Sequence, residues 1–268
     1  MKRVVPQEDW PSSWSTAYQF DLNEMYGEGV NRGLAQYYRN RKDAAIGLIA
    51  DVLPKGATIL DVAAAQGNFT LQLAELGYDV TWNDLRAELK DYVRLKYERG
   101  SVNFAPGNVF EVEFGTKFDA ALVCEIIEHV AHPDQFLRRI STLVKPGGYI
   151  VMTTPNGAYV RNKLPRFSDC PDPSVFESVQ FKPDADGHIF LLWPDEIEKI
   201  AHDAGLVVDN LEFFTTTLTC GHPLTERVLR LAPMKAVSLL EGLMDRLPMA
   251  VRRRLLMHSA ARFRTSFA

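Results

Sequence analysis

The stretch that most constrains the fold of this chain runs from Thr58 to Phe69, with the sequence TILDVAAAQGNF. Its first five residues are β-branched or apolar except for Asp61, which is typical of a short buried strand. Residues 63–67 are three alanines, a glutamine and a glycine, which favour a tight turn, and Asn68 then begins a helical pattern. Because a parallel α/β sheet binds ligands where its strands end, we expect a cofactor at this turn.

From residue 57 onward, short apolar runs alternate with amphipathic patterns. The runs that predict strands are 58–62, 78–83, 102–105, 117–123, 148–154 and 206–214, with a final strand expected within 258–267. The patterns that predict helices are 68–76, 85–98, 133–144 and 194–204. Alternation at this spacing is typical of βαβ units in a parallel sheet. Because such crossovers are right-handed, a doubly wound α/β sheet is the predicted topology.

Four segments outside this alternation predict additions to one α/β domain. Residues 1–18 are polar and contain two tryptophans, so we expect an arm that packs these side chains on the body. Residues 30–53 have apolar residues at helical spacing, which predicts an amphipathic helix. Residues 155–193 contain five prolines and little periodicity, which indicates a long loop over an active site. Residues 223–257 have a helical pattern, which two internal prolines should divide into separate helices.

The composition disfavours several classes of protein. The chain has 268 residues, 46% of them hydrophobic, and a net charge of −4. This charge disfavours a general nucleic-acid binder, which usually carries a basic stripe. No apolar run approaches the ~20 residues that span a bilayer, and the first residues lack the apolar core of a signal peptide. Cys124, Cys170 and Cys220 are widely spaced, which indicates a reducing, cytoplasmic setting and no zinc knuckle.

Acidic residues follow the first two predicted strands, Asp61 at the end of the first and Asp84 after the second. An acid at the second position suits hydrogen bonds to ribose hydroxyls, which indicates a cofactor that contains a nucleoside. A dinucleotide needs bare backbone for its pyrophosphate, and the methyl groups of Ala63 and Ala65 would crowd it. A ligand without phosphates, held by its amino-acid end, fits this loop better. The loop therefore favours S-adenosylmethionine (SAM) over NAD.

Five motifs over about residues 57–214 resemble, in their order and spacing, those of the class I SAM-dependent methyltransferases. They are ILDV (59–62) with Gly67, Asp84, GNV (107–109), FDAALVCEIIEHV (118–130) and LVKPGGY (143–149). The resemblance implies a seven-stranded, mostly parallel sheet with an antiparallel last strand, and SAM as the cofactor. The additions to this core would then be an N-terminal helical extension and a C-terminal helical insertion.

The resemblance also implies which residues contact the cofactor. The family's contacts come from the first loop, the acid after strand two, the pair after strand three and the residue that ends strand four. In this sequence these positions are Asp61, Ala63, Ala65, Gln66, Gly67, Asp84, Asn108, Val109 and Cys124. The sequence departs from the family's pattern at the first two loop glycines, which are alanine, and at the acid after strand three. Asn108 stands there instead and can still accept a hydrogen bond from an adenine amino group.

Methyl transfer to a hydroxyl needs a base or a metal ion near the acceptor oxygen, since the cofactor itself supplies the leaving group. Glu125, Glu128 and His129 follow the fourth predicted strand, spaced to share one face of a helical turn, and His188 lies in the long loop. In one hypothesis, these four residues hold Mg²⁺ or Mn²⁺, which lowers the pKa of the acceptor hydroxyl. In the other, no metal takes part and His129 or His188 is the base. The predicted catalytic residues are His129, His188 and Glu128.

The ExxEH pattern followed by His188 resembles several groups of methyltransferases. In the small-RNA 3′-terminal 2′-O-methyltransferases, these four positions hold a metal. The ubiquinone-pathway O-methyltransferases act on phenolic hydroxyls, and sugar O-methyltransferases have similar sequences. The purely structural alternative is that Glu128 and His129 cap a helix and that His188 is a polar surface residue.

The C-terminal residues 223–264 carry nine Lys and Arg side chains against three acidic ones. A basic amphipathic segment can lie on an anionic membrane or hold an anionic acceptor. The interpretation that we prefer from the sequence is a solvated helix face or the contact of a homodimer.

These observations lead to one functional prediction. We expect a SAM-dependent O-methyltransferase that acts on a hydroxyl of a small molecule, either a sugar or polysaccharide precursor or a phenolic natural product. The alternatives are methylation of an RNA terminus, which the acidic charge disfavours, and a catalytically silent cofactor-binding subunit. The predicted division is an N-terminal arm with helices (1–56), a SAM-binding core (57–214, with 155–193 as a lid) and a C-terminal helical cap with the last strand (215–268).

Overall fold

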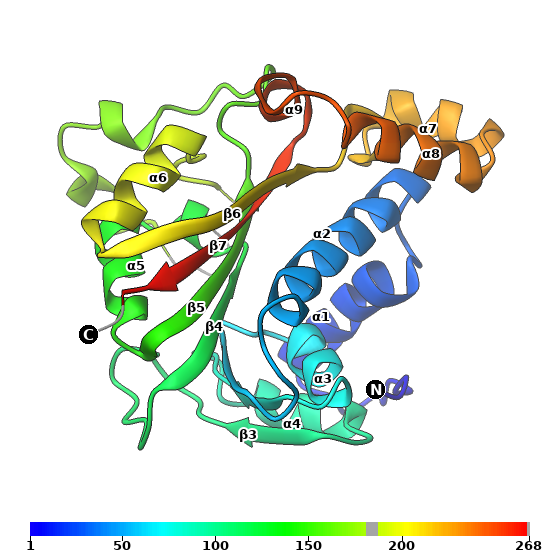
Figure 1. The fold of residues 1–268 in the computed structure, drawn as a ribbon. Coiled ribbons are helices and arrows are strands. Elements are labelled where there is room, and N and C mark those ends of the chain that lie inside the picture. Colours follow the sequence, from blue (N-terminus) through cyan, green and yellow to red (C-terminus); the bar gives the residue numbers. More distant parts are fainter. Residues whose placement is uncertain (181–186, 267–268) are drawn as a thin grey trace.

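The structure is a computed structural model that describes residues 1–180 and 187–266, and it shows a central sheet with helices on both faces (Figure 1). Over the described residues, seven strands form one sheet in the order β3-β2-β1-β4-β5-β7-β6. Neighbouring strands are parallel except at β7, which is antiparallel to β5 and to β6. The predicted doubly wound sheet of seven strands with an antiparallel last strand is confirmed.

The strands and helices lie close to their predicted positions. The strands are β1 (Thr58–Val62), β2 (Asp79–Trp82), β3 (Ser101–Phe104), β4 (Phe118–Cys124), β5 (Val144–Pro155), β6 (Leu206–Phe214) and β7 (His258–Thr265). The helices are α1 (Ser12–Asp21), α2 (Arg32–Ala50), α3 (Asn68–Glu75), α4 (Leu89–Lys96), α5 (Pro133–Ser141), α6 (Pro194–Asp203), α7 (Pro223–Leu231), α8 (Met234–Met244) and α9 (Met249–Leu255). Shorter turns are the π-helical η1 (Leu22–Tyr26) and the 3-10 turns η2 (Ile127–His129), η3 (Phe167–Asp169), η4 (Pro173–Phe176) and η5 (Thr217–Thr219).

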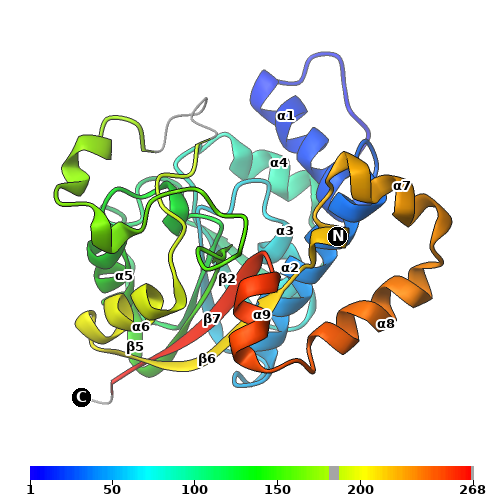
Figure 2. The ribbon, with the colours of Figure 1, turned by 90° about the horizontal axis from the view of Figure 1, so that it is seen from above.

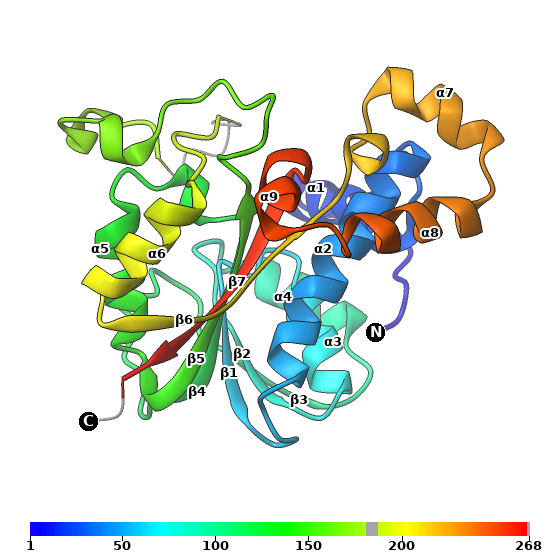
Figure 3. The same cartoon turned by 45° about the horizontal axis from the view of Figure 1, so that its top comes forward.

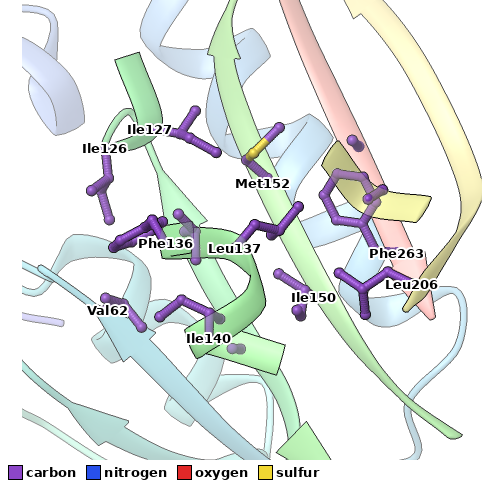
Figure 4. Close-up of a cluster of buried hydrophobic side chains, with 14 of the residues drawn as sticks. Val62, Ile126, Ile127, Phe136, Leu137, Ile140, Ile150, Met152, Leu206 and Phe263 are labelled. Atoms are coloured by element: carbon purple, nitrogen blue, oxygen red, sulfur yellow. The ribbon is translucent and has the colours of Figure 1, made fainter. Parts of the chain in front are cut away.

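The central strands are apolar on both sides because helices cover both faces of the sheet. Residues 120–123 of β4 have no exposed surface. On one face, Leu137 and Ile140 of α5 pack with strand residues such as Ile150 and Phe263 (Figure 4). On the other face, α2 and α3 cover a second apolar cluster. This packing holds the sheet rigid below the loops that follow its strands.

The strand order reverses between β1 and β4, which lie side by side and parallel. Val62 at the end of β1 pairs with Val123 near the end of β4, so the two strands finish at the same level. Open α/β sheets bind ligands at such a switch point, because the following loops leave in opposite directions. The turn at 63–67 is thereby placed next to the segment that begins at Cys124.

Two predicted boundaries are wrong by several residues. Helix α4 begins at Leu89 rather than at 85, because the Asp84 carboxylate accepts a hydrogen bond from the Arg86 N–H at 2.9 Å and closes a turn there. Strand β5 begins at Val144 rather than at 148. Val144 pairs with Phe118 of β4, and pairing resumes at Tyr149 with Ala120 after a shift of register between the two strands. Local side-chain bonding and pairing across strands decided both boundaries.

The N-terminal segment packs its tryptophans on the body as predicted, and it becomes helical from Ser12, where α1 begins. The rings of Trp10 and Trp14 lie 5.7 Å and 6.0 Å from the ring of Tyr92 on α4. Beneath them, the Asp21 carboxylate accepts hydrogen bonds from the Lys96 ammonium at 2.9 Å and the Tyr92 hydroxyl at 2.6 Å. These contacts hold α1 and η1 against the part of the sheet that carries the first loop.

A helical insertion of α7, α8 and α9 separates β6 from β7, and its α7 and α8 stand beside the N-terminal half of α2 (Figures 2 and 3). Pro233 and Pro248 lie at the N-caps of α8 and α9, which confirms that the prolines divide this segment. The insertion begins after Phe214 of β6 and ends before His258 of β7, and these two residues pair with each other. His258 also pairs with Pro155, so the insertion starts and ends near the end of β5. Among the described helices, none has the length and apolar content needed to span a membrane.

Candidate active site

The turn after β1 keeps a glycine-like backbone although it carries alanine side chains. Ala63 and Ala65 have φ angles of 50° and 46°, in the left-handed region that residues with a Cβ atom rarely adopt. This conformation costs roughly 1–2 kcal/mol for each alanine. Gly67 has a φ of 73°, and a Cβ atom there would lie 2.8 Å from Val93. The loop therefore holds its shape against the preference of two of its residues, as is common at ligand sites.

The acid after β2, Asp84, is buried beside this turn and connects three segments. Its carboxylate accepts a hydrogen bond from the Ala65 N–H at 2.8 Å and pairs with the guanidinium of Arg86 at 2.9 Å. Its backbone carbonyl accepts a hydrogen bond from the Gly107 N–H at 2.9 Å, in the loop after β3. The Arg86 side chain is 54% exposed, so this partner can leave the carboxylate without unfolding its surroundings.

The pair after β3 lies at the same edge of the sheet. The side-chain carbonyl of Asn108 accepts a hydrogen bond from the Phe110 N–H at 3.1 Å, and its amide donates to Glu111 at 2.9 Å. The next residue, Val109, is buried. Asn108 is half-buried, and its side chain stabilises the turn in which it lies. Val109 belongs to the hydrophobic core below this turn.

Two further predicted cofactor residues, Asp61 and Cys124, have structural roles inside the protein. The Asp61 carboxylate accepts a hydrogen bond from the Thr70 hydroxyl at 2.5 Å and ties β1 to α3. Burial raises the pKa of Asp61 to about 7, and the nearby charge of Asp84 acts in the same direction. Burial also raises the pKa of the Cys124 thiol well above its usual value, so Cys124 stays protonated and is suited to packing rather than to nucleophilic attack.

Two charged residues of the N-terminal helices reach this edge, and sequence reasoning missed both. Glu24 of η1 accepts a hydrogen bond from the Gln66 amide at 3.0 Å and pairs with Arg41 of α2 at 3.1 Å. The Nε atom of Arg41 is buried without a hydrogen-bond partner in the described part of the chain. A buried donor of this kind is costly unless a ligand uses it. No motif marks Arg41, because its neighbours lie far away in the sequence.

At the end of β4, Glu125 is held in a strained conformation by partners from two other elements, α2 and β5. Its φ angle is 52°, and its backbone N–H donates to the Thr153 carbonyl at 2.9 Å. Its carboxylate accepts hydrogen bonds from the Thr153 hydroxyl at 2.9 Å and from the Tyr37 hydroxyl at 3.0 Å. The Glu125 side chain is thus directed toward α2 and β5.

The next acid, Glu128, lies with two histidines in a separate group. Donor atoms of Glu128, His129 and His188 all lie within 4.8 Å of one another, and the two imidazole rings are 5.0 Å apart. The Ile189 N–H donates to the Glu128 carbonyl at 2.7 Å and fixes the loop that carries His188. Three of the four predicted metal ligands come together, while Glu125 is engaged by Tyr37 and Thr153 instead.

The two carboxylates at this site have pKa values that move in opposite directions. Burial raises the pKa of Glu128, and the neighbouring Glu125 raises it further. Burial also acts to raise the pKa of Glu125, but His258, Arg41 and the hydrogen bonds from its partners outweigh it, so this pKa is lowered. Burial lowers the pKa of His258 to about 4, which leaves Arg41 as the cation near neutral pH. Glu125 therefore carries the negative charge, and Glu128 is the group suited to a proton.

A cavity of about 440 Å³ opens beside this group, and His188 forms part of its wall. The other walls come from the loop after β5, the segment after β6 and the start of β7: Pro155, Asn156, Tyr159, Arg161, Asn162, Lys163, Leu191, Thr217, Cys220, His222, Met257 and His258. His258 was missed by sequence reasoning, and its Nδ1 atom is buried without a hydrogen-bond partner among the described residues. The predicted lid 155–193 supplies much of this lining, although its residues 181–186 lie outside the described residues.

A second cavity, of about 590 Å³, lies elsewhere and has a different character. It is lined by residues between Lys2 and Trp14 and by Leu95, and none of the predicted site residues borders it. The smaller cavity is the one that meets the carboxyl ends of the central strands, where ligands of α/β sheets bind.

Comparison with known proteins agrees with this geometry. The family model for a methyltransferase domain matches residues 34–211, which is well over half of the chain. A stretch of 107 residues is 36% identical to the ubiquinone biosynthesis O-methyltransferase of Xanthomonas axonopodis pv. citri, covering 38% of this chain and 45% of that protein. The corresponding protein of Caulobacter vibrioides is 34% identical over 106 residues, which cover 38% of this chain and 42% of that protein. The chain thus matches less than half the length of each relative.

Solved structures extend the likeness of fold over nearly the whole chain. A SAM-dependent methyltransferase from Mesorhizobium loti has a TM-score of 0.55 at 16% identity, covering 82% of this chain and 97% of that one. The [4+2]-cyclase SpnF has a TM-score of 0.57 at 17% identity, covering 96% of this chain and 97% of that one. Since a fold can host different chemistry, the structural likeness supports the architecture alone. By its sequence family and its fold, the chain belongs to the class I SAM-dependent methyltransferases, whose members use SAM as the methyl donor.

Proposed function

We propose that this protein transfers the methyl group of SAM to a hydroxyl of a small molecule that binds in the 440 Å³ cavity. The observation that carries this proposal is the group formed by Glu128, His129 and His188. Glu128 and His129 follow β4, whose end lies level with the end of β1, and His188 borders the cavity. An oxygen acceptor needs help to lose its proton, and this group offers that help.

The cofactor would bind across the ends of β1, β2 and β4. Asp84 is placed for the ribose hydroxyls once the exposed Arg86 moves away, and Asn108 with Val109 would border the adenine. The zwitterionic end of SAM needs one cation and one anion. Arg41, with its unpaired Nε, and Glu24 are the buried pair that can supply them. Cys124 and the turn at 63–67 would contact the cofactor between these ends.

The chemistry assigned to the protein is positioning and proton removal. Bound SAM supplies an electrophilic methyl group and a neutral thioether as the leaving group. The acceptor proton would pass to a ring nitrogen of His129 or His188, since imidazole is a base near neutral pH. Glu128 would accept a hydrogen bond or a proton from the histidines, because Glu125 beside it already holds the negative charge.

A metal ion is a second way for the same group to activate the acceptor. The Glu128 Oε1 atom is buried without a hydrogen-bond partner in the described chain, and two imidazoles lie near it. One carboxylate and two imidazoles suit Mn²⁺ or a later transition metal better than Mg²⁺, which prefers oxygen ligands. Glu128, His129 and His188 would hold such an ion, which would lower the pKa of the acceptor hydroxyl.

The lining of the cavity favours some acceptors over others. Arg161 and Lys163 border it together with histidines, and none of the carboxylates in the described part of the chain does. A cationic acceptor would therefore be repelled, whereas a neutral or anionic one would not. Tyr159 and several apolar side chains offer surfaces for a sugar or a phenolic ring. We accordingly propose a sugar or polysaccharide precursor, or a phenolic compound, as the acceptor.

The proposal is tested first by calorimetry and then by methyl transfer. We expect SAM to bind and NAD not to bind. Labelled SAM should then transfer its methyl group to members of a panel of phenols, sugars and nucleotide-linked sugars. Treatment with EDTA and return of Mn²⁺ should restore lost activity if a metal takes part, and should change nothing if a histidine acts alone.

Several outcomes would contradict the proposal. Tight binding of NAD, or no binding of SAM, would overturn the assigned cofactor for this chain. Transfer to the terminal ribose of short RNA but to no small molecule would replace the acceptor class with the RNA alternative. SAM binding without transfer to any acceptor in the panel would favour a silent cofactor-binding subunit.

A further inference from the structure

We propose that the helical insertion docks the protein on an anionic lipid bilayer. The docking face consists of exposed apolar side chains on α7, α8 and α9 with the cations between them, and we call it the cap face. Its apolar members are Leu224, Val228, Leu231, Leu239, Leu240, Leu243, Met249, Val251 and Leu255. Its cationic members are Arg227, Arg230, Lys235, Arg246, Arg253 and Arg254.

Helix α7 has two faces, and only one of them packs against the protein. Glu226 and Leu229 are buried, and the Leu229 carbonyl accepts a hydrogen bond from the Arg32 guanidinium of α2 at 3.2 Å. Leu224, Val228 and Leu231 are spaced by four and three residues and are 66%, 56% and 89% exposed. This spacing gathers them in a stripe along the helix. The stripe is thus a second apolar face that the fold leaves uncovered.

Helix α8 also has one face that packs against the protein and one exposed apolar face. Val237 is buried, and Glu241 accepts hydrogen bonds from Asn40 of α2 at 2.9 Å and from Thr219 at 2.6 Å, so this side of the helix faces the body. Leu239, Leu240 and Leu243 are exposed on the remaining surface. In α9, Met249, Val251 and Leu255 are exposed as well. Nine of the large apolar side chains exposed in the described chain therefore lie in this single insertion.

The exposed charges of the insertion are mostly positive, although Arg230 pairs with the buried Glu226 at 3.5 Å. Six exposed cations lie in this insertion, whereas Asp245 is its exposed acid and has Arg252 at 3.7 Å. Apolar stripes flanked by arginine and lysine are typical of helices that lie in the interface of an anionic membrane. Each cation near such a surface adds attraction to the anionic headgroups.

A second copy of the chain is the other partner that such an apolar face could meet. In a two-fold dimer through the cap face, six cations would oppose the same six cations with little acid to compensate. An anionic bilayer removes this repulsion and also covers the apolar stripes. The excess of positive charge therefore favours the membrane over self-association.

The insertion that carries the cap face is joined at both ends to segments that line the cavity assigned to the acceptor. Cys220 and His222 line that cavity just before α7, and Met257 and His258 line it just after α9. A docked insertion would hold the cavity near the lipid surface, within reach of an acceptor that is carried by the membrane. This consequence rests on the proposed function, whereas the docking itself does not.

The test is co-sedimentation of the full chain with vesicles. We expect binding to vesicles with about one-third phosphatidylglycerol in phosphatidylcholine and little binding to pure phosphatidylcholine. Binding should weaken at about 0.5 M NaCl, because salt screens the attraction. The assay contains neither SAM nor an acceptor, so its failure says nothing about methyl transfer, and a failed transfer assay says nothing about docking.

Two sets of variants locate the docking surface. Leu224→Ser with Val228→Ser and Leu231→Ser should lower vesicle affinity at least about tenfold, since three apolar side chains are lost from the interface. Arg253→Glu with Arg254→Glu should lower it by a similar factor. The matched controls are Val207→Ser on β6, which is also exposed, and Lys2→Glu with Lys117→Glu, which makes the same change of charge elsewhere. Circular dichroism and SAM binding confirm that each variant is folded.

Three results would overturn the docking. The first is no binding of the folded wild-type chain to anionic vesicles. The second is vesicle binding that the control substitutions reduce as much as the cap-face substitutions do. The third is a dimer, seen by light scattering, that the Leu224, Val228 and Leu231 changes dissociate while vesicles are not bound.

Discussion

The two halves of the candidate site are built in different ways. The cofactor half uses the turn at 63–67, Asp84 and Asn108, which follow neighbouring strands within a short part of the chain. The acceptor half brings together residues that are far apart, with Tyr37 donating to Glu125 and the cavity wall ending at His258. The cofactor half is therefore a local motif repeated at strand ends, and the acceptor half is a product of tertiary packing.

The difference also appears in the way each half holds charge. In the cofactor half, the Asp84 carboxylate accepts a hydrogen bond from the Ala65 N–H and pairs with the exposed Arg86. In the acceptor half, Glu125 is half-buried and Glu128 is buried near it, and their pKa values move apart. Two like charges in one apolar site favour this outcome, which often separates an acid from a base. In the cofactor half, the hydrogen bonds of the site are already formed. In the acceptor half, the neighbouring residues set the pKa values of the two carboxylates.

The largest expected effect is on turnover in the acceptor half. His129→Ala or His188→Ala should lower turnover by about 100-fold or more, because general base catalysis contributes on that scale. SAM affinity measured by calorimetry should change by less than about twofold, since neither residue belongs to the cofactor half. The matched control is His202→Ala, an exposed histidine on α6 whose side chain is 90% exposed. Equal loss of SAM affinity in the His129 variant would show that the two halves are not separable.

The next largest effect concerns the stability of the cofactor half as pH changes. The pKa of Asp61 is about 7 in the folded protein and 3.8 in the reference state, so between these values the folded protein binds more protons. Stability should therefore fall as pH rises through this window, by at most ~4 kcal/mol. Asp61→Asn should flatten the pH profile of urea unfolding in the cofactor-free protein. Thr70→Val removes a hydrogen bond that lowers this pKa and should extend the fall in stability to higher pH; an unchanged profile in both variants would contradict the assignment.

A smaller effect is expected on cofactor affinity when the ribose acid is changed. Asp84→Asn keeps the size of the side chain and should weaken SAM binding by about 10–30-fold, because hydrogen bonds to a charged group are lost. Turnover at saturating SAM should stay within a few-fold of the wild-type value. The control Asp79→Asn lies at the start of the same strand, where its carboxylate accepts from Ser101 and Asn103. If both variants bind SAM equally well, Asp84 does not hold the ribose.

The smallest effect tests the strained alanines. Ala63→Gly and Ala65→Gly should each stabilise the protein by up to ~1 kcal/mol, because relief of the left-handed strain exceeds the entropy that glycine loses on folding. Ala64→Gly is the matched control between them, where only the entropic cost applies, and it should destabilise by ~0.5–1 kcal/mol. Denaturant unfolding measures all three. A destabilised Ala63→Gly variant would mean that its methyl group packs usefully in the loop.

Much of the fold could be predicted because its information is local. Apolar runs bounded by turns marked the strands, and helical spacing marked α2, α3, α5 and α6. The boundaries that failed, at Leu89 and Val144, depend on a side-chain turn and on a register shift with a neighbouring strand. Neither can be derived from periodicity within the segment itself.

For the site, motif and spacing located the residues but not their partners. Glu125 and Glu128 were both predicted as metal ligands, yet Glu125 is bonded to Tyr37 and Thr153, whereas Glu128 lies with His129 and His188. Their pKa values depend on burial and on Arg41, which belongs to a helix more than eighty residues earlier. Arg41 and His258 carried no motif that could have marked them.

The sequence by itself therefore determined the order of the strands and helices, the position of the first loop and the residues that follow β1, β2 and β4. These features depend on side chains a few positions apart, whose preferences act before any long-range contact forms. Only the tertiary structure decided which carboxylate is charged, where the cavity lies and which apolar faces of α7, α8 and α9 stay uncovered. Those properties depend on burial and on distances between remote segments, because charge and hydration respond to the whole packed environment.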